Sequence, residues 1–423
     1  MKINLKYLEV VWLLVFFIVG CFYRTTLVAN ILITTIIMYA LRVLLSQAFE
    51  LKIVIIFIIM YMSTFYQYFF WGNQISYYTQ FNSYSNLYET MLICYLFNGF
   101  FIYTLSKLKC EKIEIIIKDN VLIYFLSFVI CVFLFLNGVN GEIGNYKNIE
   151  LSTSAEYSII FFLLAFYYSG NSFIKRTSLT IIYLFFGIYA LLIGSRIVSI
   201  QYMMAIFLVS DWKIFSIIRK KSANIKGNLN IIYILLAMLL MKGIGAIRSS
   251  GLSIQKLLVA MFSTSNQTGV VINNQSDVIY STVSLIALES QGVIDFKVKV
   301  LSFIQHIAGL FLPGSLNGEY SNFPAFVVKN SINYGGGGGF FFGPIYIWFG
   351  YIGVILIAVF LGKSMTIAYT GRCSTIFKFY VLILIITLFR WYPYTIYGIY
   401  KLPLYGVIMY YIANLVDRTM RKK

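Results

Sequence analysis

Residues 335–361 read GGGGG-FFFGPIYIWFGYIGVILIAVFL, five consecutive glycines followed by 22 residues without a charged side chain. A helix of about 20 apolar residues crosses a hydrocarbon core about 30 Å thick. Inside a bilayer the backbone N–H and C=O groups must bond to one another, which a helix achieves within its own segment. This stretch therefore predicts a membrane-spanning helix that begins directly after a glycine run.

The whole chain has the same character. Hydrophobic residues make up 60% and charged residues 11% of its 423 residues, whereas soluble domains carry about 25% charge. The composition predicts an all-α, polytopic integral membrane bundle of about twelve transmembrane helices, in one domain (residues 1–423) without an appended soluble catalytic domain. The predicted spans are Leu8–Tyr23, Thr25–Ser46, Leu51–Trp71, Leu87–Ser106, Asn120–Val139, Thr153–Ser169, Ser178–Gly194, Ile197–Ser210, Ile231–Ile247, Phe340–Leu361, Phe379–Tyr397 and Leu402–Val416.

The distribution of Lys and Arg predicts the orientation, because cytoplasmic loops hold the positive charge. With the N-terminus inside, the basic clusters in residues 107–118, 175–176, 213–226, 363–378 and 418–423 all fall on the cytoplasmic side. We therefore expect both termini in the cytoplasm. This topology, with attraction to anionic membrane lipid, accounts for the net charge of +18 without a nucleic-acid partner.

The long segment 248–339 is predicted to lie outside and to hold the functional site. It is rich in Ser, Asn and Gly and contains His306, the single histidine of the chain. Residues Lys297–Pro313 carry a polar stripe on an apolar helix, which predicts an interfacial helix that presents His306 outward. Ser281–Glu289 is a second candidate of the same kind. The stripe consists of Ser302, Gln305, His306 and Gly309.

Three arginines are predicted in the outer half of the membrane: Arg196, Arg248 and Arg390. Topology does not favour cations there, and the planar guanidinium fork suits phosphate oxygens. The alternative is that they reach out to lipid phosphate or, for Arg390, belong to an aromatic belt that starts at Trp391. We expect at least two of them to bind a phosphorylated ligand.

The glycine run 335–339 admits two interpretations. Its backbone N–H groups beside a helix N-terminus could accommodate phosphate. A flexible hinge would need no ligand at all. It is not a nucleotide-binding P-loop, because no Gly-Lys-Ser follows.

Glu289 and His306 are the preferred candidates for proton transfer, since a carboxylate near a bilayer surface or an imidazole can act as a base. The same segment holds three rival acids: Asp277, Asp295 and Glu319. The outer segment has no paired carboxylates, and the five cysteines show no paired spacing. We therefore expect neither a metal site nor a cofactor.

This layout resembles the Wzy-type O-antigen and capsule repeat-unit polymerases of bacteria over nearly the whole chain. The resemblance rests on the Gly194-Ser195-Arg196 turn between two spans, on the outer arginine before a long late loop, and on the Gly-rich entry into Phe349-Gly350-Tyr351-Ile352-Gly353. Where that family commonly has a Glu shortly before the Phe-Gly segment, this chain has Pro344. No role is carried over for that acid.

The resemblance implies a GT-C-like, metal-independent glycosyltransferase at the outer face of the bacterial cytoplasmic (inner) membrane. It would transfer a growing glycan from undecaprenyl diphosphate to the non-reducing end of another lipid-linked repeat unit, in lipopolysaccharide or capsule biosynthesis, with a chain-length regulator and a flippase as partners. Glu289 or His306 would deprotonate the acceptor hydroxyl. The diphosphate would be bound by Arg196, Arg248 and Arg390, and the sugars by Tyr320, Tyr334 and Trp391.

Other membrane functions remain open. A flippase for lipid-linked oligosaccharides would also need cations for the diphosphate, but along a path through both leaflets. An O-antigen ligase would share the arginines and the loop histidine and would differ in its acceptor. A channel or scaffold would leave the outer arginines without a purpose. The long one-sided loop favours the polymerase.

Overall fold

The structure is a computed structural model that describes residues 5–44, 49–75, 83–106, 113, 117–142, 145–151, 153–193, 195–209, 255, 274–312, 318, 320, 338–371 and 373–422. In these ranges six helices are long and apolar enough to cross a membrane, and a bent pair can form a seventh span. The chain is therefore a multi-pass helical membrane protein. The predicted span 231–247 lies outside the described residues, and the count of twelve spans and the cytoplasmic termini stay predictions.

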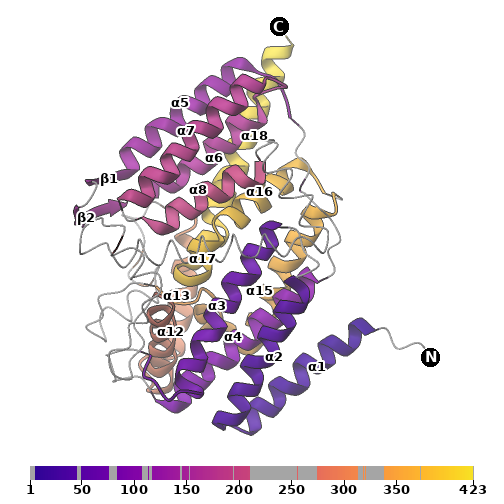
Figure 1. Ribbon diagram of the computed structural model, residues 1–423, viewed down its shortest axis with the longest axis vertical. Helices are drawn as coiled ribbons and strands as arrows, with labels where there is room; N and C mark the ends of the chain where they lie inside the picture. Colours follow the sequence, from indigo (N-terminus) through magenta and orange to yellow (C-terminus); the bar gives the residue numbers. More distant parts are fainter. Residues whose placement is uncertain are drawn as a thin grey trace.

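The helices form two groups, which Figure 1 shows in the lower and upper parts of the molecule. The lower group is α1 (Leu5–Phe22), α2 (Thr26–Leu44), α3 (Phe49–Phe69), α4 (Tyr84–Leu105) and α15 (Phe342–Tyr369). The upper group is α5 (Val121–Gly138), α6 (Thr153–Tyr167), α7 (Phe173–Leu192), α8 (Arg196–Val209), α16 (Thr375–Ile386) and α18 (Lys401–Arg421). A hairpin of β1 (Val139–Glu142) and β2 (Asn145–Leu151) joins α5 to α6.

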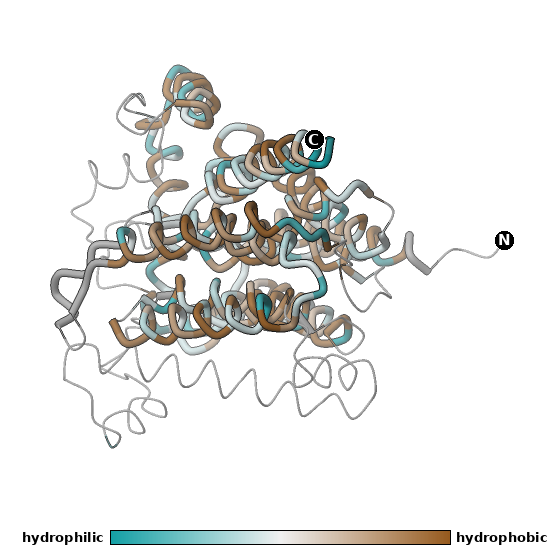
Figure 2. The backbone as a smooth tube through the Cα atoms, turned by 90° about the horizontal axis from the view of Figure 1, so that it is seen from above, coloured by the Kyte–Doolittle hydropathy of each residue, from teal (hydrophilic) through white to brown (hydrophobic). Residues whose placement is uncertain are grey.

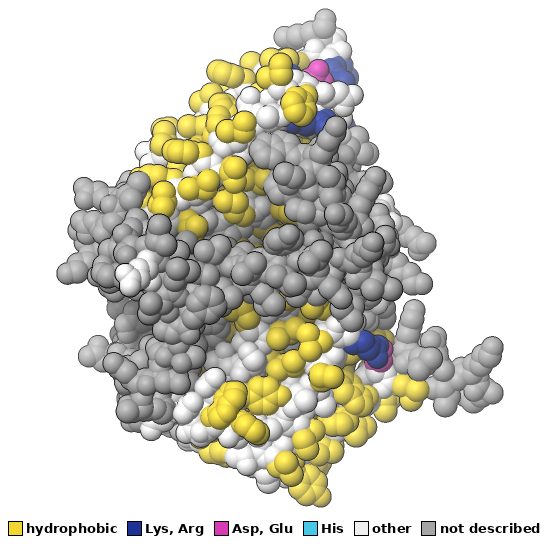
Figure 3. Space-filling model, viewed as in Figure 1, with side chains coloured by type: hydrophobic (Ala, Val, Ile, Leu, Met, Phe, Trp, Pro, Cys, Tyr) yellow, Lys and Arg dark blue, Asp and Glu magenta, His cyan; other side chains and the backbone are white. Residues whose placement is uncertain are grey.

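Apolar side chains cover the described outer surface of both groups. Figure 3 shows them over the upper and the lower helices, and Figure 2 shows hydrophobic residues along most of the length of the helices. Phe22, Phe173 and Ile352 are among the most exposed, at 80%, 74% and 71%. A water-soluble monomer rarely exposes such large contiguous apolar surface, so these faces are suited to contact lipid.

Helix α4 is the centre of the lower group, and α15 packs along it. The Thr366 hydroxyl of α15 donates to the Thr104 carbonyl at 3.1 Å. A Cβ atom on Gly362 would lie 1.6 Å from Thr104 Oγ1 and 3.2 Å from the Phe101 carbonyl oxygen. The close approach of the two helices therefore depends on a glycine at this position.

Gly362→Ala is expected to destabilise the protein by about 1–3 kcal/mol, because a methyl group there overpacks the contact between α4 and α15. Thermal unfolding of the purified variant in detergent measures the effect. Gly187→Ala is the matched control, since its new methyl would lie 3.0 Å from the flexible end of Met203 and in ordinary contact with Tyr202 Cβ at 3.6 Å. Equal unfolding temperatures for both variants would contradict this account of the packing.

Helix α15 reverses its direction at Gly350, where φ is +62° and ψ is −159°. Phe342 stacks on Phe97, near the middle of α4, with ring centroids 4.7 Å apart. Tyr346 and Tyr351, on the two sides of Gly350, both donate a hydrogen bond to Glu89 near the start of α4. Residues 342–349 thus run toward the Glu89 end of α4, and residues 351–369 run back along it.

Helices α12 (Asn274–Ser290) and α13 (Phe296–Ala308) follow the predicted outer segment but differ in burial. Every residue from 278 to 288 is buried, and α12 packs against α3, α4, α15 and α17 (Leu388–Tyr394). The expectation that Ser281–Glu289 lies at the membrane interface is therefore wrong. The reason is that the serine and threonine hydroxyls of α12 bond to its own backbone, which lets the helix enter the core.

Helix α13 has the predicted polar stripe, but the stripe faces the protein. Ser302 and His306 are its buried residues, whereas Ile304 is 55% exposed and Ile307 is 44% exposed. The Trp348 indole N–H donates to Ser302 Oγ at 2.9 Å. The expectation that His306 points outward is thus corrected, because in an apolar solvent the polar side of a helix is the one that is buried.

Candidate functional site

Arg196 and Arg390 both lie near Tyr394, on two helices, α8 and α17 (Leu388–Tyr394), that pack against each other. Arg196 is the first residue of α8, and Arg390 lies in α17, which is bent by 62° from α16. Both guanidinium groups are within electrostatic range of the Tyr394 hydroxyl, and that of Arg390 lies 5.7 Å from the centre of the Tyr394 ring. The structure thus brings two of the three predicted arginines together, whereas Arg248 lies outside the described residues.

Glu156, in the first turn of α6, is a site residue that the sequence interpretation missed. Its carboxylate oxygen Oε1 lies 3.4 Å from Arg390 Nε. Among the residues that the structure describes, Glu156 is the one polar partner of the Arg390 side chain, which is 40% exposed. The terminal nitrogens of the guanidinium group are therefore left for a ligand. A signal existed: Glu156 is an acid near the start of a predicted span.

Gln201 of α8 lies beside the Glu156 carboxylate and is fully buried, at 0% exposure. Its amide nitrogen and oxygen make no hydrogen bond of normal geometry to any described residue. A buried amide usually has a partner, because leaving one unpaired costs about 1–3 kcal/mol. Gln201 therefore adds a buried polar group next to the Glu156 carboxylate.

Asp277 completes the group that we call the arginine cluster. Its carboxylate, in the first turn of α12, is within electrostatic range of Tyr61 and Tyr394, as is Arg196. Glu156, Arg196 and Asp277 lie in the first turns of α6, α8 and α12, so the N-termini of these helices, each with a partial positive charge, are near this region. The two arginines and the two carboxylates balance in formal charge, so the helix termini supply the excess of positive charge that favours an anion. The arginine cluster consists of Arg196, Arg390, Glu156, Asp277 and Tyr394.

The described end of the glycine run packs against this cluster. Gly338 has a φ of +152°, and a Cβ atom there would lie 2.3 Å from Tyr394 Cδ1. Two residues later, the Phe340 N–H donates to Thr282 Oγ1 of α12 at 2.9 Å. Gly338 is thus required for the close approach of Tyr394, which in turn contacts Arg390. Glycines 335–337 lie outside the described residues, so the predicted phosphate cradle and the hinge both stay open there.

Gly338→Ala is expected to displace the Tyr394 ring and to reduce activity of the site, because the added methyl clashes and the backbone conformation is strained. A loss of about 1–3 kcal/mol in stability should accompany it. Differential scanning calorimetry and an activity assay on the same preparation measure both. The control is Gly371→Ala, which has a similarly positive φ of +71° but no atom within 4 Å of its Cβ position. Equal effects of the two variants would contradict the role of the Tyr394 contact.

The structure does not bring Glu289 to the arginine cluster. Glu289 forms an ion pair with Lys299 at the far end of α12 from Asp277. Twelve residues of helix separate the two acids, which corresponds to about 18 Å. His306 is 3% exposed and packs against the rings of Trp348, Tyr397 and Tyr400. Glu289 and His306, the two predicted proton acceptors, therefore make their contacts with residues outside the arginine cluster.

The aromatic residues predicted to bind sugar have different surroundings. Trp391 is fully buried, and its indole N–H donates to the Leu384 carbonyl at 2.9 Å, so it anchors α17 in the core. Tyr320 is partly buried, and its backbone N–H donates to Gln305 Oε1 at 2.7 Å. Tyr334 lies outside the described residues.

A second acid, the buried Glu89, was also missed, although it lies inside a predicted span. It is 8% exposed and accepts hydrogen bonds from Arg24 at 2.9 Å and from Tyr346 at 2.8 Å. Tyr351 donates to the same carboxylate. Glu89 therefore ties the turn between α1 and α2 to the reversal of α15. Because these donors satisfy its charge, its contacts are those of a structural residue.

No group of three or more His, Cys, Asp and Glu side chains in the described ranges could hold a metal ion. Comparison of the chain with protein-family models, with curated proteins and with solved structures finds no match. The function therefore has to be argued from the arginine cluster itself.

Proposed function

We propose that this chain is a membrane glycosyltransferase that polymerises lipid-linked oligosaccharide repeat units and binds the polyprenyl diphosphate at the arginine cluster. The bond between the anomeric carbon of the growing glycan and its diphosphate breaks. A hydroxyl at the non-reducing end of a second lipid-linked repeat unit forms the new glycosidic bond and gives up its proton. Undecaprenyl diphosphate is the proposed leaving group.

The observation that carries this proposal is the Arg390 side chain. Ionisable groups among membrane helices are costly and are therefore functional-site candidates by default. Arg390 has a single described polar partner, is 40% exposed, and lies near the N-termini of three helices. Preorganised donors of this kind stabilise negative charge as it develops on a leaving diphosphate.

The position of Asp277 supports a role for it in removing the acceptor proton. The reaction needs a base close to the anomeric carbon, and thus close to the diphosphate. Asp277 shares the surroundings of Tyr61 and Tyr394 with Arg196, whereas Glu289 is at the other end of the same helix. Within the proposed reaction, Asp277 is therefore a better candidate than Glu289 or His306.

Polymerisation is expected to persist in EDTA, because two arginines and three helix N-termini supply the positive charge that a metal ion would supply. The measurement is the rate of glycan lengthening by the purified protein before and after chelation. A loss of activity that magnesium or manganese restores would contradict this part of the proposal.

The glycan profile of a strain that lacks this protein tests the function. Loss of a polymerase should leave single repeat units on the surface acceptor, since export and attachment continue. Complete absence of the surface glycan would instead indicate a flippase or a ligase. An unchanged profile would remove the chain from this process.

A flippase is the second candidate, and the broken helices favour it. Helices α16 and α17 are bent by 62°, and α15 reverses at Gly350. Transporters bind anionic substrates at discontinuous helices of this kind. Transport of lipid-linked repeats into the lumen of vesicles, without a change in glycan length, would favour the flippase over the polymerase.

A further inference from the structure

The way Arg390 is held has a distinct geometry. A guanidinium group has five N–H donors, one on Nε and two on each terminal nitrogen. Glu156 Oε1 lies 3.4 Å from Nε, and no other polar contact of this side chain exists within the described residues. The carboxylate therefore pairs with Nε and leaves the two terminal nitrogens, which form the fork that can bind a phosphate.

The face of the guanidinium group is fixed as well. The Tyr394 ring lies beside it, with 5.7 Å between the guanidinium carbon and the ring centroid. Arginine has many rotamers, and a ligand that must order them binds more weakly than one that meets an ordered side chain. Contacts at Nε and on one face reduce this freedom while the terminal nitrogens stay accessible.

Glu156 is itself held by its neighbours. The Tyr202 hydroxyl of α8 donates to the carbonyl of Ala155 at 2.7 Å, and the Ser158 hydroxyl donates to Tyr202 at 3.0 Å. Gln201 lies directly beside the carboxylate. The first turn of α6 is therefore fixed against α8, the helix that also begins with Arg196.

We propose that Glu156 is a positioning residue that orients Arg390 toward the diphosphate and does not itself touch the ligand. This inference rests on the proposed function, because it takes a diphosphate as the ligand of the arginine cluster. It gives Glu156 a role in binding the diphosphate, although the negative charge of a carboxylate by itself would repel an anionic ligand.

The sign of the effect separates this role from simple electrostatics. A carboxylate near a bound anion repels it. If Glu156 only lay near the ligand and did not orient Arg390, neutralising it would therefore tighten anion binding. Neutralising a positioning residue weakens binding, because Arg390 becomes free to leave its orientation. Glu156→Gln keeps the size of the side chain, and the two hypotheses predict opposite results for it.

The experiment is a calorimetric titration of the purified full-length protein in detergent with inorganic diphosphate at fixed ionic strength. We expect the wild type to bind and Arg390→Ala to bind on the order of 100-fold more weakly, a loss that still leaves a measurable affinity. Glu156→Gln should weaken binding on the order of tenfold, because it removes the negative charge of the ion pair that holds Arg390 Nε. In the Arg390→Ala background, Glu156→Gln should add no further loss, because the two residues act as one unit.

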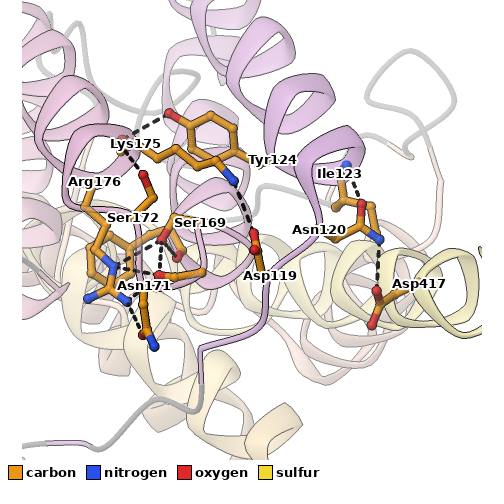
Figure 4. A network of polar contacts seen from close by, with 12 residues as sticks. Asp119, Asn120, Ile123, Tyr124, Ser169, Asn171, Ser172, Lys175, Arg176 and Asp417 are labelled. Carbon is orange, nitrogen blue, oxygen red and sulfur yellow. Dashed lines mark hydrogen bonds and ion pairs between the residues drawn. The ribbon is translucent and has the colours of Figure 1, made fainter. Parts of the chain in front are cut away.

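Two further variants keep the test decisive. Glu156→Asp retains the charge but draws the carboxylate away from Nε, so positioning predicts weaker binding and electrostatics predicts no change. Asp119→Asn is the matched control, since it removes an ion pair with Lys175 of 3.1 Å in a different network of the protein (Figure 4). It should leave the affinity for diphosphate unchanged.

The outcomes separate the positioning role of Glu156 from the proposed function of the protein. Binding that depends on Arg390 but is equal or tighter in both Glu156→Gln and Glu156→Asp overturns the positioning role and leaves the proposed function intact. Absence of diphosphate binding by the folded wild type removes the ligand from the proposed function, and the inference falls with it.

Discussion

Arg390→Ala is expected to reduce the rate of glycan polymerisation by about 100-fold or more. A hydrogen bond to a charged group contributes about 1.5–3 kcal/mol, and the terminal nitrogens of Arg390 can make two of them to one phosphate. If both act in the transition state, their loss corresponds to about 10²–10⁴-fold in rate. Arg390→Lys keeps the charge but loses the planar fork, so its rate should fall by about 10- to 100-fold.

The measurement is the initial rate of glycan lengthening by purified variants at matched protein concentration. Arg418→Ala is the control, because Arg418 is an exposed arginine on α18, which the arginine cluster does not include. Its rate should equal that of the wild type. A rate for Arg390→Ala within about twofold of the wild type, a loss far smaller than that expected for even one such hydrogen bond, would remove Arg390 from the site.

Asp417→Leu is expected to have the largest effect on stability, at about 3 kcal/mol. Asp417 of α18 is 2% exposed and accepts a hydrogen bond from Asn120 at 2.9 Å (Figure 4). It accepts a second hydrogen bond from Arg421 at 3.0 Å. Lys118 Nζ lies 3.7 Å from the same carboxylate. Removing one partner of a buried ion pair costs about 3–5 kcal/mol, and we expect the lower end because Lys118 and Arg421 are partly exposed.

Unfolding of the purified variants by heat or denaturant checks this expectation. Asp119→Asn serves as the comparison, because the Asp119 carboxylate is 67% exposed and exposed ion pairs contribute about 0–1 kcal/mol. If Asp417→Leu unfolds at the same temperature as Asp119→Asn, the network does not hold α18 to α5.

Much of the fold could be predicted because a segment that crosses lipid must be a helix of about 20 apolar residues. The apolar run after the glycines forms α15, although this helix reverses at Gly350, inside the single span predicted over Phe340–Leu361. The polar stripe of Ser302 and His306 lies on one side of α13. Periodicity predicted the stripe but not its direction. In water the polar side of a helix faces out, whereas beside lipid it faces the protein.

The burial of α12 could not be predicted from its hydropathy. Its hydroxyls make the sequence look like a surface segment, yet Ser281, Thr282 and Ser284 each donate to a carbonyl one turn earlier in the helix, at 2.8 to 3.1 Å. With these groups satisfied internally, the helix is apolar enough for the core.

The candidate site was predicted in part. Arg196 and Arg390 were singled out because cations on the predicted outer side conflict with topology, and the structure brings them together at Tyr394. The partners Glu156 and Gln201 were missed because the contact between Glu156 and Arg390 joins residues far apart in the sequence. A pairing of this kind depends on tertiary packing and leaves no local pattern in the sequence.

The most direct test of the central claim is reconstitution of the reaction. Purified protein in lipid vesicles is given a single undecaprenyl-diphosphate-linked repeat unit, and the products are separated by length. The account predicts a ladder of longer lipid-linked glycans, one released undecaprenyl diphosphate for each bond formed, and loss of both in Arg390→Ala. Repeat units that stay at their original length with active, folded protein and a verified substrate would contradict it.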